Sequence, residues 1–195
     1  GDLESLAAAA GYIGGQVAHP GSELGQGYDR AMQELVFDPL GMDDTTFDYA
    51  RAQTGNYASP HGYDIDHAVQ VMDMGLNETV AASRPAGAAW STVNDVLKYV
   101  QMEIDLGSLP DGSRYIGEPA LLQRREPQIA TGVDLDYAMA LEVDRADGVE
   151  VIDHGGAMGG FRSNMMWWPE QKVGAVILTN ADEGGYLLGP FKRYL

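Results

Sequence analysis

The chain has 195 residues, of which 45% are hydrophobic, enough for one domain with a sizeable core. Its 12 basic and 29 acidic residues give a net charge of −17, which argues against nucleic acid and anionic membrane surfaces as partners, because both need a basic patch. The absence of cysteine excludes disulfides, thiolate metal sites and cysteine nucleophiles.

The first part of the chain is predicted to be mainly helical. Residues 3–18 have helical character interrupted by glycines, and residues 26–37 form a second helix that Pro39 and Gly41 stop. Residues 43–87 are acidic and rich in Asn, Gly, Pro and Tyr, which is typical of a long irregular surface segment.

The helix with the clearest signals begins near Thr92. Thr92 and Asp95 resemble a capping box in which Asp replaces Glu. Apolar residues then recur on one face as far as Ile104, and Gly107 ends the helix. A short helix is expected to follow over residues 118–126.

From about residue 136 the pattern becomes that of strands. The predicted strands are Tyr137–Val143, Val149–Asp153, Gly160–Trp167 and Val173–Leu178. Their short connecting turns make the sheet antiparallel. Because the last strand is almost entirely apolar, we expect it to be central and covered on both faces.

These elements place the chain in the α+β class. We expect residues 1–130 to form a mainly helical and loop region, and residues 131–195 to form antiparallel strands and a closing helix. Both regions are expected to belong to one domain.

Neither a complete serine-hydrolase motif nor a metal motif is present. None of the eight serines is followed by Lys three residues later, and no Gly-x-Ser-x-Gly sequence occurs. His61 and His67 flank Asp64 and Asp66, but their spacing matches no common zinc or EF-hand pattern. We therefore expect a solvated acidic loop there, and no cofactor.

Four stretches together resemble the serine β-lactamase and penicillin-binding-protein superfamily, in particular its class C β-lactamase-like branch. They are FDPLGMDDTT at residues 37–46, PAGAAWSTVNDV at 85–96, DHGGAMGGFRS at 153–163 and PEQKVGAVILTN at 169–180. Their order and spacing also agree with that branch, which includes esterases and D-amino-acid peptidases. The resemblance implies a β-lactamase/transpeptidase-like fold and acyl-enzyme hydrolysis of a small ester, lactam or peptide.

The resemblance also implies a site. His154-Gly155-Gly156 matches the His-x-Gly form of the strand that carries Lys-Thr-Gly in other members and lies beside the nucleophile helix. His154 would then orient the substrate or assist proton transfer. The small glycines would let strand, helix and substrate approach one another, and the backbone N–H of Ala157 would be one of two oxyanion-hole donors.

Two of the three motifs of the superfamily are not found. The Ser-x-x-Lys helix would lie upstream of residue 1. Aligning Tyr12 with the second aromatic residue usual in that region puts Tyr-x-Asn at Ala7-Ala8-Ala9, and aligning Tyr12 as the motif tyrosine puts Gly14 where Asn should be. The general base is therefore unassigned, and a catalytically inactive binding or scaffold member is the alternative function.

The chain is thus expected to be the C-terminal portion of a fold that is incomplete at its N-terminus. A companion N-terminal segment or a second copy would be needed to cover one sheet face and one sheet edge. No apolar run reaches the ~20 residues that cross a bilayer, and the start lacks a basic leader. We expect a soluble protein, with the compartment unassigned and a periplasmic or secreted location left open.

Overall fold

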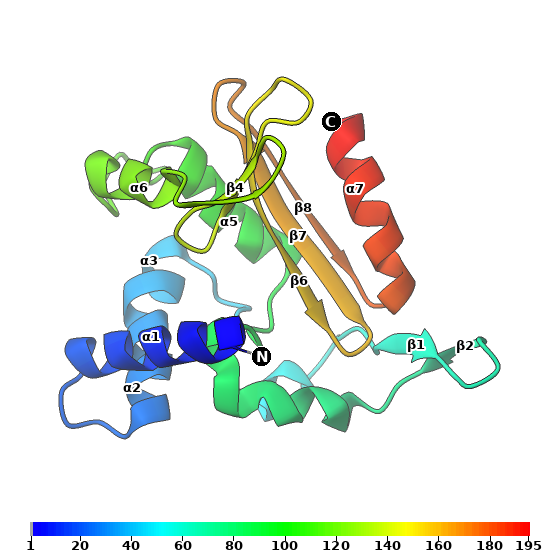
Figure 1. Cartoon of the computed structure of the whole chain (residues 1–195). Coiled ribbons are helices and arrows are strands. Elements are labelled where there is room, and N and C mark those ends of the chain that lie inside the picture. Colours follow the sequence, from blue (N-terminus) through cyan, green and yellow to red (C-terminus); the bar gives the residue numbers. More distant parts are fainter. Residues whose placement is uncertain (1) are drawn as a thin grey trace.

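The computed structural model describes residues 2–195 and contains a six-stranded antiparallel sheet with helices on both faces (Figure 1). The strands follow one another in chain order. They are β3 (Ile129–Gly132), β4 (Leu135–Tyr137), β5 (Glu142–Asp144), β6 (Val151–Met158), β7 (Phe161–Trp168) and β8 (Val173–Thr179). The α+β class and the antiparallel sheet are confirmed.

The two sheet faces are covered by two different helices. Helix α5 (Val93–Ile104) packs on one face, where Val100 joins a cluster with Ile152 and Trp167. Helix α7 (Gly185–Tyr194) packs on the other face, where Phe191 contacts a buried cluster that includes Met166. Strand residues alternate between these two cores, as the period of a strand requires.

The helical region lies beside one end of the sheet (Figure 1). Its elements are α1 (Asp2–Ala18), α2 (Leu24–Met32), the π-helical segment η1 (Gln33–Phe37), α3 (Asp38–Leu40) and α4 (Tyr49–Ala52). Helix α6 (Glu118–Arg125) joins a third core, in which Leu121 meets Phe37 and Met102. The predicted helices at 92–104 and 118–126 are confirmed.

Three expectations about the first half are corrected. Glycines do not interrupt α1; a Cβ on Gly15 would lie 2.5 Å from the backbone N of Tyr28, so its absence lets α2 pack closely. Pro39 does not stop the second helix, because α2, η1 and α3 continue into one another and the carbonyl of Leu35, four residues before Pro39, accepts from Tyr115 Oη at 2.6 Å. Gly41 ends the helix at φ 65°. The segment 43–87 is not irregular throughout. It holds the hairpin β1 (His61–Tyr63) and β2 (Val69–Val71), and the 3₁₀ segment η2 (Met74–Ala86).

Two expectations about the sheet are also corrected. The predicted strand Tyr137–Val143 is two strands, because the chain turns over residues 138–141 and Ala140 adopts φ 55°. Strand β8 is covered on both faces as expected, by α5 and α7, yet within residues 2–195 it pairs only with β7 and is therefore an edge strand. The short segment η3 (Asp182–Gly184) then leads into the predicted closing helix.

The β6–β7 turn depends on Gly160. Its φ is 76°, in the region that favours glycine, and a Cβ there would lie 2.5 Å from Cβ of Pro60 and 2.8 Å from the backbone N of His61. The chain that presses on this turn is therefore the segment entering β1.

We expect Gly160→Ala to lower the free energy of unfolding by about 2–3 kcal/mol, since it combines a left-handed backbone with a clash against backbone atoms. Gly159→Ala is the matched control, because a Cβ there meets nothing closer than Asn77 Oδ1 at 3.6 Å. Urea unfolding of both variants checks this, and equal losses at the two positions would contradict the role given to Pro60 and His61.

A buried carboxylate ties α5 to α6. Glu103 has no exposed surface, and it accepts hydrogen bonds at 2.8 Å from Arg124 and at 2.8 Å from Arg125. Tyr99 donates to the same carboxylate at 2.7 Å, and burial raises the pKa of that phenol well above its ordinary value. The Arg125 guanidinium also lies 5.5 Å from the centre of the Trp167 ring, so this cluster reaches the sheet core.

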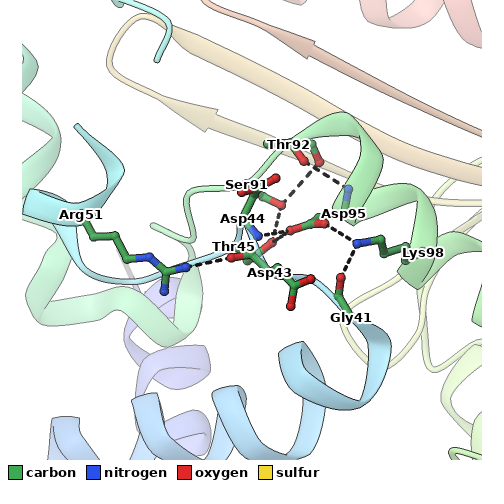
Figure 2. Close-up of polar contacts among 9 residues, drawn as sticks. All are labelled: Gly41, Asp43, Asp44, Thr45, Arg51, Ser91, Thr92, Asp95 and Lys98. Atoms are coloured by element: carbon green, nitrogen blue, oxygen red, sulfur yellow. Dashed lines mark hydrogen bonds and ion pairs between the residues drawn. The ribbon is translucent and has the colours of Figure 1, made fainter. Parts of the chain in front are cut away.

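A second buried carboxylate joins two of the four resemblance stretches, 37–46 and 85–96 (Figure 2). Asp95 is 2% exposed and accepts hydrogen bonds from the backbone N of Asp44 at 2.8 Å and from Thr45 Oγ1 at 2.9 Å. Lys98 donates to its other oxygen at 2.9 Å and also to the carbonyl of Gly41. Burial by itself would raise the pKa of Asp95, but these hydrogen bonds and the Lys98 charge outweigh it and lower the pKa.

Candidate functional site

The four predicted site residues lie together on β6, where that strand loses one of its partners. Strand β5 pairs with β6 only from Val151 to Asp153, whereas β7 pairs with it as far as Met158. From His154 onward, no described strand lies on the β5 side of β6. Backbone N–H and C=O groups on that side are thus available to a ligand, as they are on any open sheet edge.

An open hollow of about 360 Å³ adjoins this segment of β6. It is bounded by β6, the first half of β7, the start of β5 and α7. Its lining residues are Glu142, Asp153, His154, Gly155, Gly156, Ala157, Arg162, Asn164 and Leu188. All four residues predicted from the sequence therefore line one hollow.

His154 is held by a tyrosine that the sequence interpretation did not single out. Tyr137 Oη lies 3.2 Å from His154 Nε2, and the two rings meet edge to face with centres 6.1 Å apart. Tyr137 is 17 residues away in sequence and comes close only because the chain turns after β4. No spacing pattern could have indicated this pair.

The two glycines that follow His154 have different surroundings. A Cβ on Gly156 would lie 2.4 Å from Ser163 Oγ on β7, whereas a Cβ on Gly155 would meet only the carbonyl of Ser163, at 3.6 Å. Both glycines and Ala157 are exposed. The small side chains thus leave the strand uncovered at the hollow, and Gly156 also makes room for Ser163.

Opposite charges are paired on the α7 side of the hollow. Asp153 is 2% exposed and forms an ion pair with Lys192, which also donates to Asp144 at 2.6 Å. Burial would lower the pKa of Lys192, but its hydrogen bonds to both carboxylates raise it instead. For Asp144 the opposing effects run the other way: burial raises the pKa and Lys192 lowers it, with a net lowering. Lys192 is therefore held as a cation between two carboxylates.

The arginine that lines the hollow is also engaged. Arg162 donates to the carbonyls of Met158 at 3.0 Å and Phe161 at 2.7 Å, and it forms an ion pair with Asp182 at 2.8 Å. Both nearby cations are thus paired with carboxylates of the protein, Arg162 through Nη1 alone, while Glu142 and Asp153 add negative charge to the lining.

Two other candidate regions, the possible motif residue Tyr12 and the acidic loop at Asp64, lie away from the hollow. Tyr12 packs among helices, donates to the carbonyl of Ala82 at 2.6 Å and is not part of the hollow. The acidic loop at Asp64 is a hairpin turn, in which that carboxylate accepts from the backbone N of Asp66 and Ala68. Among residues 2–195, no cluster of His, Asp or Glu is arranged to hold a metal ion.

Comparison with known proteins agrees with this architecture. The family model described as Beta-lactamase matches residues 4–188. "Penicillin-binding protein 4" of Amycolatopsis lactamdurans is 30% identical over 166 residues, covering 80% of this chain and 42% of that protein. The chain spans less than half the length of the curated relatives it matches, 42% and 45%.

Solved structures show the same fold at lower sequence identity. The octameric penicillin-binding protein homologue from Pyrococcus abyssi matches with a TM-score of 0.67 and 18% identity, over 80% of this chain and 34% of that one. A class C β-lactamase mutant matches with a TM-score of 0.60 and 19% identity, over 79% and 47% of the two chains. Among residues 2–195, no helix combines the length and apolar character that crossing a membrane requires. The family match over nearly the whole chain shows that it belongs to the Beta-lactamase family.

Proposed function

We propose that this chain is the C-terminal part of a serine hydrolase of the class C β-lactamase-like branch, with its nucleophile on polypeptide outside residues 1–195. The observation that carries the proposal is the open segment of β6, which presents His154 and three small residues to a hollow. Such an edge suits a substrate that must lie against a strand and receive backbone hydrogen bonds.

The reaction would proceed through an acyl-enzyme. The serine oxygen forms a bond to the substrate carbonyl carbon, and the negative charge that develops on the carbonyl oxygen is stabilised by backbone N–H donors, including that of Ala157. The bond to the alcohol or amine then breaks, and that group leaves with a proton. Water subsequently attacks the acyl-enzyme, releases the acid and restores the serine. His154 would orient the substrate or assist these proton transfers.

The charges at the hollow favour a neutral ester or amide over a substrate that carries a carboxylate beside the scissile carbonyl. Lys192 and Arg162 each form ion pairs with carboxylates of the protein, and Glu142 and Asp153 lie on the lining. A net charge of −17 further disfavours the approach of anions at low ionic strength. An esterase or D-aminopeptidase is thus favoured over a dedicated β-lactamase.

Fluorophosphonate labelling of the full-length gene product tests this function. We expect a mass adduct on a serine of an upstream Ser-x-x-Lys sequence, and a labelling rate that falls about a hundredfold in His154→Ala if the histidine assists proton transfer. His67→Ala is the control, because His67 lies in the β1–β2 hairpin, away from the hollow. Absence of an upstream adduct would reject the enzyme, and equal rates in both variants would reject the role of His154.

The alternative is a member that keeps the fold without catalysis. It is favoured by the alanines at positions 7–9 of α1, where one alignment places Tyr-x-Asn, and by the lack of Ser-x-x-Lys in this chain. The labelling experiment separates the two functions. For the chain in isolation we expect no turnover under either of them.

The same proposal includes a companion segment. Strand β8 offers seven residues without proline or charge at a sheet edge whose faces are already covered by α5 and α7. Natural edge strands are usually shortened, charged or kinked, so a strand of this kind suits pairing with further polypeptide. We assign that place to an upstream segment of the same gene product, with a second copy as the alternative, in a soluble protein whose compartment is left unassigned.

A further inference from the structure

Tyr137 is fixed by backbone contacts on both sides of its strand. It is the last residue of β4, opposite Ile129 on β3 and Glu142 on β5, and its carbonyl accepts from the backbone N of Gln128 at 2.9 Å. The next residue, Ala138, is buried and closes the turn by donating to the carbonyl of Leu141 at 2.8 Å. The phenol is therefore held on a rigid support.

From this position Tyr137 reaches the imidazole of His154 just beyond the last residue of β6 that pairs with β5. The 3.2 Å separation joins Oη to Nε2, and the edge-to-face ring contact limits rotation of the imidazole. Within residues 2–195, Nδ1 has no hydrogen-bond partner of its own. Only one of the two ring nitrogens is thus engaged by the protein.

The chemistry of the two groups decides which of them donates. A neutral imidazole has one N–H and one basic nitrogen, and that nitrogen is a much stronger base than a phenol oxygen. The stronger hydrogen bond is therefore the one in which the Tyr137 O–H donates to an unprotonated Nε2. The proton of the neutral ring must then be on Nδ1.

We propose that Tyr137 is a positioning residue that holds neutral His154 in its Nδ1–H tautomer and leaves Nδ1, rather than Nε2, to face the ligand. The catalytic use of this tautomer rests on the proposed function. In the acyl-transfer site, Nδ1–H would donate to the substrate or to the leaving group, and Tyr137 would act only through the imidazole.

Long-range ¹H–¹⁵N correlation spectra of the uniformly ¹⁵N-labelled full-length gene product test the tautomer directly. At a pH where the imidazole of His154 is neutral, we expect the ¹⁵N chemical shift of Nε2 to be that of an unprotonated nitrogen. The shift of Nδ1 should be that of a protonated nitrogen. In Tyr137→Phe, which keeps the ring contact and removes the hydroxyl, the majority tautomer should reverse to Nε2–H.

Tyr63→Phe is the matched control, because Tyr63 meets His67 edge to face at 6.2 Å, in a second tyrosine–histidine pair where no hydrogen bond joins the two side chains. It should leave the spectra of both histidines unchanged. A wild-type His154 that is mainly Nε2–H would overturn the proposal without any variant, and so would an unchanged ratio in Tyr137→Phe. These spectra do not depend on enzyme activity, so a failure of this proposal can be distinguished from a failure of the labelling experiment.

Discussion

Glu103→Gln is expected to lower the free energy of unfolding by about 3–5 kcal/mol, the loss typical of removing one partner from a buried charge cluster. The substitution keeps the shape of the side chain but leaves two neighbouring guanidiniums without a counter-charge. Glu103 is fully buried and Arg125 is 8% exposed, so water does not replace the carboxylate at Arg125, whereas Arg124 is 26% exposed and is partly hydrated. Denaturant unfolding followed by circular dichroism measures the change.

The control for this experiment is Glu126→Gln, which removes an exposed carboxylate just after α6. Its effect should stay within about 0.5 kcal/mol, as for ordinary surface changes. If Glu103→Gln and Glu126→Gln gave the same midpoint and slope, the carboxylate would not be the junction between α5 and α6 that its hydrogen bonds indicate.

Asp95→Asn is expected to cost about 2–3 kcal/mol at neutral pH, because a buried, charged acceptor loses its charge-assisted bonds. Asp44 and Thr45 both donate to Oδ2, so an Asn oxygen in that position can keep both bonds, but the amide group that faces Lys98 no longer balances its charge (Figure 2). The pKa of Asp95 is lowered in the folded protein, so its stabilisation is present above the unfolded value of about 4 and is lost as the pH falls through the folded pKa.

The difference between wild type and Asp95→Asn should therefore be largest near neutral pH and shrink in acid. Unfolding free energies measured from pH 7 down to pH 3 check this. Asp105→Asn provides the control, since Asp105 is an exposed aspartate at the other end of α5. A pH-independent gap for Asp95→Asn would mean that packing rather than charge accounts for the loss.

Elements whose structure depends on residues close together in the sequence are predicted correctly. The helix from Val93 to Ile104 was predicted because Thr92 caps it and its apolar residues share one face, and in the structure Thr92 accepts from the backbone N of Asp95. The β7–β8 hairpin was predicted for a similar reason, since a turn sequence separates two apolar runs.

Prediction fails for features that depend on contacts between residues far apart in the sequence. The turn over residues 138–141 lies inside an apolar run, and nothing local marks Ala140 for a positive φ. The apolar composition of β8 predicts a central strand, but it reflects the helices α5 and α7 on its two faces, and within residues 2–195 the strand has only β7 beside it. For the site, the resemblance supplied His154 to Ala157, whereas Tyr137, Arg162 and Asn164 meet it only through the sheet register and remained unassigned.

Because β8 pairs on one side only within residues 2–195, we expect ionic strength to control whether copies of this chain associate. At low salt the charge of −17 keeps copies apart, so their open strands rarely meet. Raising the salt shortens the Debye length from about 10 Å at 0.1 M to about 3 Å at 1 M, and that repulsion is screened while backbone hydrogen bonding across the edge is not. Concentrated salt should therefore favour strand-to-strand association of a chain that stays dispersed in dilute buffer.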